Sequence, residues 1–271
     1  MAVIACSIGY MNLTDDEVLK MQKGNTPIFF DDICALYSPT IGEIVDIGYS
    51  KFQQYVSILT AEKPISQKTD DAELQKLLES LTDFQYIIMM VMTDREANQI
   101  FKEGFRFFTH EDQISFLTSP EQIIIGPLEQ SNFMGEREFY DFQRLLKRMC
   151  FIEQDGEEII IYDDDNPAVR KLKMQRKANR EKLRRAKAKK ARQEGTDLKF
   201  SDLIGSLCFG ECGLNGSNIY NITYYMFYDQ LKRSGWHEQF EINNRAAMAG
   251  AKLNKSQLKH WMRSIASSDK S

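Results

Sequence analysis

In the first half of the chain, the spacing of apolar residues changes repeatedly between that of strands and that of helices. Residues 28–37 (IFFDDICALY) contain the short apolar runs of one or two strands, and Pro39 then opens a helical pattern. Gly48 interrupts that pattern, which resumes with Phe52, Tyr55, Val56 and Leu59. Leucines at helical spacing also predict a short amphipathic helix over residues 71–81.

The most apolar segment of the chain is FQYIIMMVM, residues 84–92. It is apolar on nearly every side, so we expect it at the buried centre of the N-terminal region, with Asp83 as its N-cap. Residues 135–150 return to helical spacing. Between these two helices the pattern predicts three short strands, over residues 105–109, 113–118 and 121–125.

The second half predicts one long helix followed by shorter ones. After a β-like run at 157–162, three consecutive aspartates precede Pro167, which is a strong signal for a helix start. We expect that helix to run to about Gln193 and to end at Gly195. A short helix over 198–209, an aromatic helix over 218–231 and a last helix capped by Asn254 complete the pattern.

The predicted fold class is therefore α+β and mostly helical. We expect an N-terminal body with a small antiparallel sheet over residues 1–166 and a basic helical connector over 167–195. A small all-α C-terminal module would occupy residues 196–271.

Charge divides the chain at the same places. Residues 170–192 contain 13 Lys and Arg against one acid, Glu181, a net charge of +12. The preceding 169 residues carry 13 basic and 30 acidic side chains, a net charge of −17, and residues 193–271 carry +1. The overall net charge of −4 thus hides an acidic body joined to a strongly basic helix.

The basic helix has two possible uses. Its lysines and arginines could neutralise the phosphates of a nucleic acid, although no aromatic residues lie between them for base stacking. Alternatively it is a solvated connector that attracts the acidic body of its own or a neighbouring subunit. The residues expected to form this electrostatic connector are Lys173, Arg176, Lys177, Arg180, Arg184, Arg185 and Lys189.

Nothing in the sequence indicates catalysis or a bound metal. Cys208 and Cys212 form a C-x₃-C pair without a second pair, and the three histidines are far apart. Nucleotide-binding and hydrolase motifs are missing, so we expect no catalytic residues, no metal and no cofactor. An odd number of cysteines, five, favours a reducing cytoplasm, and no apolar run approaches the roughly 18 residues of a membrane span.

The C-terminal region is rich in aromatic residues and is the candidate partner-binding region. One face of a small module cannot easily bury all of them, so some could form a groove for an apolar partner helix. The alternative is a small helical domain that packs its two tryptophans against the aromatic helix. The candidate partner-binding residues are Tyr220, Tyr224, Tyr225, Phe227, Tyr228, Trp236 and Trp261.

Two segments carry a resemblance to phage proteins. Residues 37–60 (YSPTIGEIVDIGYSKFQQYVSILT) resemble the opening of cytoplasmic proteins of tailed phages that infect Gram-positive hosts. Residues 218–233 (NIYNITYYMFYDQLKR), preceded by a Lys/Arg-rich connector, resemble the C-terminal part of phage tail assembly chaperones.

The resemblance implies a non-enzymatic protein of the host cytoplasm. Its expected partners are the long, apolar tape-measure protein, which it would keep soluble during virion assembly, and the tail-tube protein, with self-association also expected and no membrane contact. The competing interpretations are a nucleic-acid-binding accessory protein that uses the basic helix and a structural component of the phage particle.

Overall fold

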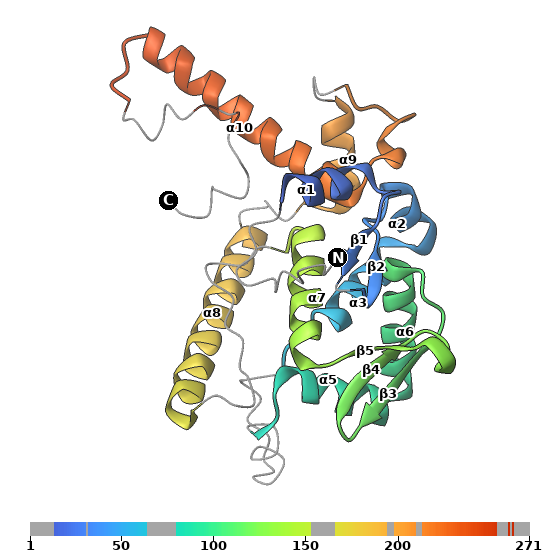
Figure 1. Cartoon of the computed structure of the whole chain (residues 1–271). Coiled ribbons are helices and arrows are strands. Elements are labelled where there is room, and N and C mark those ends of the chain that lie inside the picture. Colours follow the sequence, from blue (N-terminus) through green and yellow to red (C-terminus); the bar gives the residue numbers. More distant parts are fainter. Residues whose placement is uncertain are drawn as a thin grey trace, which may run out of the picture. The chain divides into compact units, whose positions relative to one another are not determined.

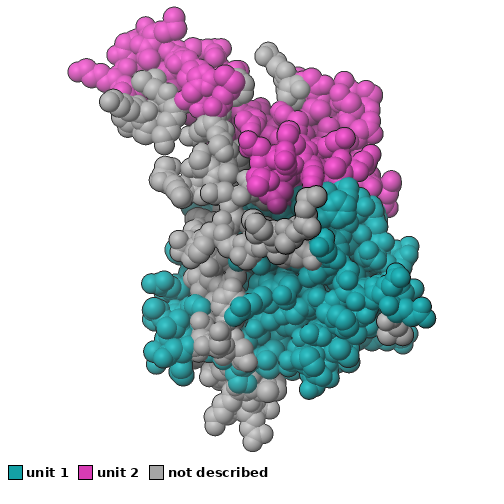
Figure 2. Space-filling view, in the orientation of Figure 1, with its two compact units in different colours: residues 1–8, 27–37, 47–198 teal, residues 9–26, 38–46, 199–271 magenta. Residues whose placement is uncertain are grey.

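The computed structural model describes residues 14–30, 32–63, 80–152, 166–193, 198–209, 213–253, 260 and 262 (Figure 1). Helices predominate, and two small antiparallel sheets accompany them, which confirms the predicted α+β, mostly helical fold class. The chain forms two compact units (Figure 2). Unit 1 comprises Met1–Ile8, Pro27–Tyr37 and Ile47–Leu198, and unit 2 comprises Gly9–Thr26, Ser38–Asp46 and Lys199–Ser271.

Unit 1 combines a cluster of helices with both sheets. Its helices are α3 (Tyr49–Leu59), α5 (Asp83–Thr93), α6 (Arg95–Thr109), the 3₁₀ turn η1 (Leu128–Gln130), α7 (Glu136–Met149) and α8 (Pro167–Gln193). Its strands are β1 (Ile28–Phe30) and β2 (Cys34–Leu36), which pair with each other, and β3 (Ile114–Thr118), β4 (Glu121–Ile125) and β5 (Asn132–Met134), which form the second sheet in that order.

The core of unit 1 consists largely of phenylalanine rings. The rings of Phe105 and Phe142 stack with their centroids 5.2 Å apart and so join α6 to α7, and Phe84 of α5 lies 5.2 Å from Phe139 of α7. Large aromatic side chains bury the most apolar area per residue, so this cluster supplies much of the hydrophobic stabilisation of the unit. The fully buried rings are Phe30, Phe84, Phe101, Phe105, Phe108, Phe139 and Phe142.

One of the three predicted strands of unit 1 is part of a helix. Residues 105–109, predicted as a strand, form the last turn of α6. A short apolar run is compatible with a strand or with a buried helix. In the structure, Phe101, Phe105 and Phe108 follow helical spacing and all face the core. The third strand of the sheet is instead β5, whose three residues pair with β4 at Ile123↔Met134, Ile124↔Phe133 and Ile125↔Asn132.

The start of α5 also differs from the prediction. Thr82, not Asp83, is the N-cap: its hydroxyl accepts a hydrogen bond from Gln85 N at 3.2 Å, and the Gln85 side chain accepts one from Thr82 N at 3.0 Å. This capping box satisfies the backbone N–H groups of Thr82 and Gln85. Asp83 is therefore the first helical residue, and its carboxylate is available for other contacts.

Unit 2 is helical and gathers segments from both ends of the chain. It contains α1 (Asp15–Lys23), most of α2 (Ile41–Ile47), α9 (Phe200–Phe209), the 3₁₀ turn η2 (Ile219–Asn221) and α10 (Tyr224–Met248). The predicted helix over 218–231 is thus a short turn, an extended Ile222 and the start of a helix that runs to Met248. Thr223 breaks the pattern because its hydroxyl caps α10 by accepting a hydrogen bond from Met226 N at 3.0 Å.

Several sequence-based predictions lie wholly or mostly outside the described residues: the helix over 71–81, the β-like run at 157–162 and the helix after Asn254. The division at residues 166 and 195 stays a prediction. Among the helices that the structure describes, none is both long and apolar enough to cross a membrane.

Gly104 allows the close contact between α6 and α3. A Cβ atom at this position would lie 3.0 Å from Tyr55 Cβ and 3.2 Å from Tyr55 Cα. Alanine normally stabilises a helix interior by about 1 kcal/mol relative to glycine. Here the neighbour is partly backbone and cannot rotate away, so overpacking of about 1–3 kcal/mol outweighs that gain.

We therefore expect Gly104→Ala to lower the free energy of unfolding by about 1 kcal/mol. The matched control is Gly205→Ala in α9, where no atom lies within 4 Å of the added Cβ and a stability gain of about 0.5–1 kcal/mol is expected. Calorimetric melting of the three proteins checks both signs. A higher melting temperature for Gly104→Ala than for the wild type would contradict the close packing of α3 on α6.

Candidate functional site

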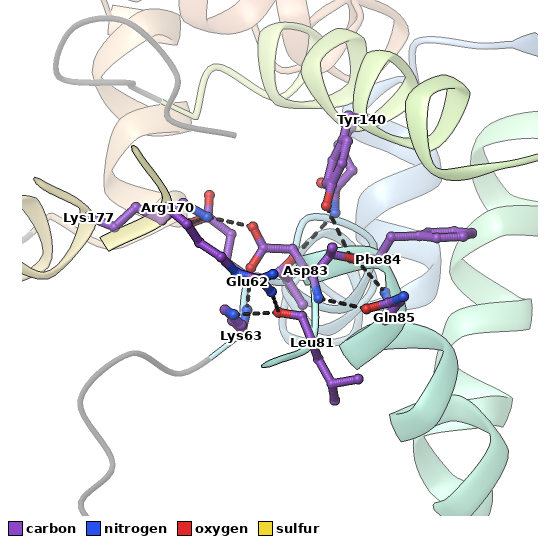
Figure 3. A network of polar contacts seen from close by, with 12 residues as sticks. Glu62, Lys63, Leu81, Asp83, Phe84, Gln85, Tyr140, Arg170 and Lys177 are labelled. Carbon is purple, nitrogen blue, oxygen red and sulfur yellow. Dashed lines mark hydrogen bonds and ion pairs between the residues drawn. The ribbon is translucent and has the colours of Figure 1, made fainter. Parts of the chain in front are cut away.

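The basic helix α8 contacts the acidic body of its own unit through a buried lysine. The Lys177 side chain is only 8% exposed, and its Nζ lies 2.5 Å from Asp83 Oδ2 and 3.1 Å from Glu62 Oε2 (Figure 3). Glu62 is also bound from α7, where Lys147 Nζ lies 3.2 Å from its Oε1. Two carboxylates and two ammonium groups therefore meet where α8, α5 and α7 approach one another.

Asp83 is held in place from several sides. Its side chain is 4% exposed, and its Oδ1 accepts a hydrogen bond from Lys63 N at 3.0 Å, so both carboxylate oxygens have partners. The next residue, Phe84, donates its backbone N–H to the Tyr140 hydroxyl at 3.4 Å. Full hydrogen bonding of this kind is the condition under which a buried carboxylate is tolerated.

Arg170 provides a second anchor on the same face of α8. It precedes Lys177 by seven residues, which is about two helical turns, so both side chains lie on one side of the helix. Arg170 Nη2 donates to the carbonyl oxygens of Ser80 at 2.5 Å and Leu81 at 3.0 Å. The Lys63 ammonium group also donates to the Leu81 carbonyl.

The ion pairs favour the charged forms of Glu62 and Lys177. Burial alone raises the pKa of Glu62, but the neighbouring ammonium groups of Lys177 and Lys147 outweigh burial and hold that pKa below its ordinary value. Burial likewise lowers the pKa of Lys177, yet Asp83 and Glu62 raise it above its ordinary value. Neither group is therefore tuned to exchange protons near pH 7, which fits an attachment site better than an acid–base site.

The other residues of the predicted electrostatic connector lie in different environments. Lys173 and Arg180 are half-buried, whereas Arg176, Arg185 and Lys189 are exposed, and the side chain of Arg184 lies outside the described part. Sequence reasoning did not identify Glu62, Asp83 or Arg170 as members of this site. The one available signal was Asp83, an acidic residue directly before the most apolar segment of the chain, and we interpreted it as the N-cap of that helix.

In the described part of the chain, no group of three or more His, Cys, Asp or Glu residues could hold a metal ion. Cys208 is half-buried at the end of α9, and Cys212 lies outside the described residues.

The aromatic region differs from the expected exposed groove. Tyr224, Tyr225 and Phe227 are 6%, 7% and 0% exposed, so these three predicted partner-binding residues form part of the core of unit 2. The Phe200 ring of α9 packs against Phe227 at a centroid distance of 5.4 Å. Of the others, Tyr220 is 44% exposed, Tyr228 and Trp236 are half-buried, and Trp261 lies outside the described residues.

Segments from the start of the chain cover the beginning of α10. Thr40 and Thr223 form an antiparallel bridge, flanked by hydrogen bonds from Ile41 N to the Ile222 carbonyl at 2.9 Å and from Tyr224 N to the Pro39 carbonyl at 2.8 Å. Backbone pairing of this kind fixes both segments in register. It also explains why an apolar segment of a small module could be buried after all.

The rest of α10 leaves apolar side chains at the surface. No residue of the described segment 230–248 is buried. Ile242 is 53% exposed and Met248 89%, and Phe209, at the end of α9, is 96% exposed. The second half of α10 and the end of α9 therefore offer apolar surface to a partner, as do Leu19 of α1 and Val45 of α2, which are 60% and 49% exposed.

Comparison with known proteins indicates a phage protein. A family model described as the YomV second domain matches residues 187–266. This is a phage-type domain, of the kind found in proteins like those of Bacillus phage SPbeta. The matched segment begins near the end of α8 and includes α9 and α10. No curated protein matches the chain, and no solved structure matches it.

Replacing Lys177 should loosen α8 from the body. Lys177→Met leaves Asp83 buried without its counter-ion, and the loss of one partner of a buried pair costs about 3 kcal/mol or more. The matched control is Lys182→Met, an exposed lysine of the same helix, for which we expect a change within about 0.5 kcal/mol. Urea denaturation measures both. Equal stabilities of the two variants would contradict a structural role of the Lys177 ion pairs.

Proposed function

We propose that the protein is a non-enzymatic tail assembly chaperone of a phage. In this role it binds the apolar, helical tape-measure protein in the host cytoplasm and keeps it soluble until the tail-tube protein assembles around it. Two features support the proposal: the match of residues 187–266 to a phage-type domain, and the apolar surface that this segment presents.

The observation that carries the proposal is the exposure of large apolar side chains on the second half of α10. A helix that is buried only near its start must gain the rest of its stability elsewhere, because isolated helices are marginal in water. Residues 230–248 extend over about 28 Å at 1.5 Å per residue, long enough to lie along a helix of a partner. Ile242 and Met248 then lose their exposed apolar area to the complex, which favours binding.

The buried aromatic residues have a supporting role in this proposal. Tyr224, Tyr225 and Phe227 anchor the start of α10 in the core of unit 2. They thereby fix the direction in which the second half of the helix extends. Replacing them would unfold the unit rather than remove a contact, so they are unsuitable for testing the function.

The test is co-expression of the tagged protein with the tape-measure protein of the same genome. We expect the wild type to bring the tape-measure protein into the soluble fraction and to retain it at high salt, because apolar contacts are not screened. The double variant Ile242→Ser and Met248→Ser should weaken capture by roughly tenfold or more, as truncation of central interface residues costs about 1–2 kcal/mol each. Its control is Glu238→Ser with Gln239→Ser, two exposed polar positions of the same helix.

Two outcomes would contradict the proposal. One is a tape-measure protein that stays insoluble with the wild type. The other is recovery of nucleic acid that salt removes from the tagged protein, without the tape-measure protein, because this favours a nucleic-acid-binding function of the basic helix.

A further inference from the structure

Away from the side that forms the ion pairs, α8 carries two exposed leucines, and an exposed valine lies about 80° around the helix from Lys177. Val169 is 44% exposed, Leu172 49% and Leu183 62%, on a helix that is otherwise mostly Lys, Arg, Gln and Ala. At about 100° per residue, Leu172 and Leu183 lie roughly 120–140° around the helix axis from Lys177. They are thus separate from the contacts that hold α8 to unit 1.

These three residues occupy first or fourth heptad positions, and the two such positions between Leu172 and Leu183 are the polar Arg176 and Asn179. Counting Val169 as the first position of a heptad places Leu172 at the fourth position and Leu183 at the first position two heptads later. We call the line formed by Val169, Leu172 and Leu183 the outer seam. Side chains at this spacing stay on one side of a helix and can pack against a second helix that runs alongside it.

Positive charge surrounds the outer seam. Lys171, Arg176, Lys182 and Lys189 are all exposed, and residues 170–192 carry a net charge of +12. Arg176 occupies the first heptad position between Val169 and Leu183, so two copies of α8 packed through their seams would bring like charges together. A helix with carboxylates beside its apolar residues complements the seam in both properties.

We propose that the outer seam of α8 binds an acidic amphipathic helix of a partner protein. The apolar positions of the partner cover Val169, Leu172 and Leu183, and its carboxylates pair with Arg176 and the neighbouring lysines. This surface belongs to unit 1 and adds to the proposed contact of α10, and it does not depend on that contact or on the identity of the partner.

The contacts of Lys177 and Arg170 with the body fix the orientation of the outer seam. With Lys177 and Arg170 fixed to the body, α8 presents one defined side to a partner, so less conformational freedom is lost on binding. The carboxylates of Asp83 and Glu62 neutralise the positive charge on the inner side of α8. The positive charges on the outer side are left to attract an acidic partner and speed its association.

The test uses a fluorescent synthetic peptide of about 28 residues, with Leu at the first and fourth heptad positions and Glu at the flanking ones. Anisotropy titration with the full-length protein measures binding. We expect measurable affinity that falls, without vanishing, between low salt and physiological salt. A peptide with Lys in place of Glu should not bind.

The decisive comparison is between variants of the full-length protein. Leu172→Ser combined with Leu183→Ser should weaken binding of the acidic peptide at least tenfold. The control Gln175→Ser changes an exposed, uncharged position of α8 that lies about 60–80° around the helix from both leucines, and it should leave the affinity within twofold of the wild type.

Three results would overturn the proposal. They are absence of binding to the acidic peptide, an equal loss of affinity in the leucine double variant and in Gln175→Ser, and tighter binding of a duplex DNA of about 20 base pairs that the leucine substitutions do not alter. The last result assigns α8 to polyanions in general. Because the co-expression test uses variants of α10, failure of that proposal and failure of this one are separable.

Discussion

The position of the basic helix depends on one ion-paired cluster, in which the buried Lys177 meets the buried Asp83 and the more exposed Glu62. A helix as polar as α8 buries little apolar surface of its own, so hydrophobic packing cannot hold it in place. Removing a carboxylate and an ammonium group from water is costly, and the cost is offset only when both are paired and fully hydrogen-bonded. Asp83 meets this condition because Lys63 N binds its second oxygen.

This arrangement gives the positive charge of α8 two uses. On the inner side, Lys177 binds the Asp83 carboxylate and Arg170 donates to the Leu81 carbonyl, which attaches the helix to the acidic body. On the outer side, the charge stays at the surface beside three exposed apolar residues. Unit 2 shows a related division along α10, whose start is buried under N-terminal segments and whose remainder presents apolar side chains at the surface. In both helices, one part is held against the rest of its unit and another part is exposed to solvent.

Local signals in the sequence predicted much of this fold. Pro167 after three aspartates located the start of α8, and helical spacing between Gly135 and Cys150 located α7. The failures came from contacts between distant residues. Phe105 and Phe108 form a short apolar run that fits a strand or a buried helix equally well, and the packing of α6 in the core decides between the two.

The site was less predictable than the fold. The partnership of Lys177 with Asp83 spans 94 residues, and the hydrogen bond from Thr223 to the Gln22 carbonyl spans 201. No periodicity of the chain encodes such distances. Sequence reasoning therefore selected Lys177 as one of seven basic residues without its partners, and it expected Tyr224, Tyr225 and Phe227 at a surface that the N-terminal segments in fact cover.

The most direct test of this account is hydrogen–deuterium exchange along α8, in the wild type and in Lys177→Met. We expect the backbone amides near Arg170 and Lys177 to exchange more slowly in the wild type than those near Lys189. In the variant this extra protection should fall by roughly a hundredfold, while the amides of α7 stay protected. Unchanged protection near Lys177 in the variant would show that the ion pairs do not hold the helix and would contradict the account.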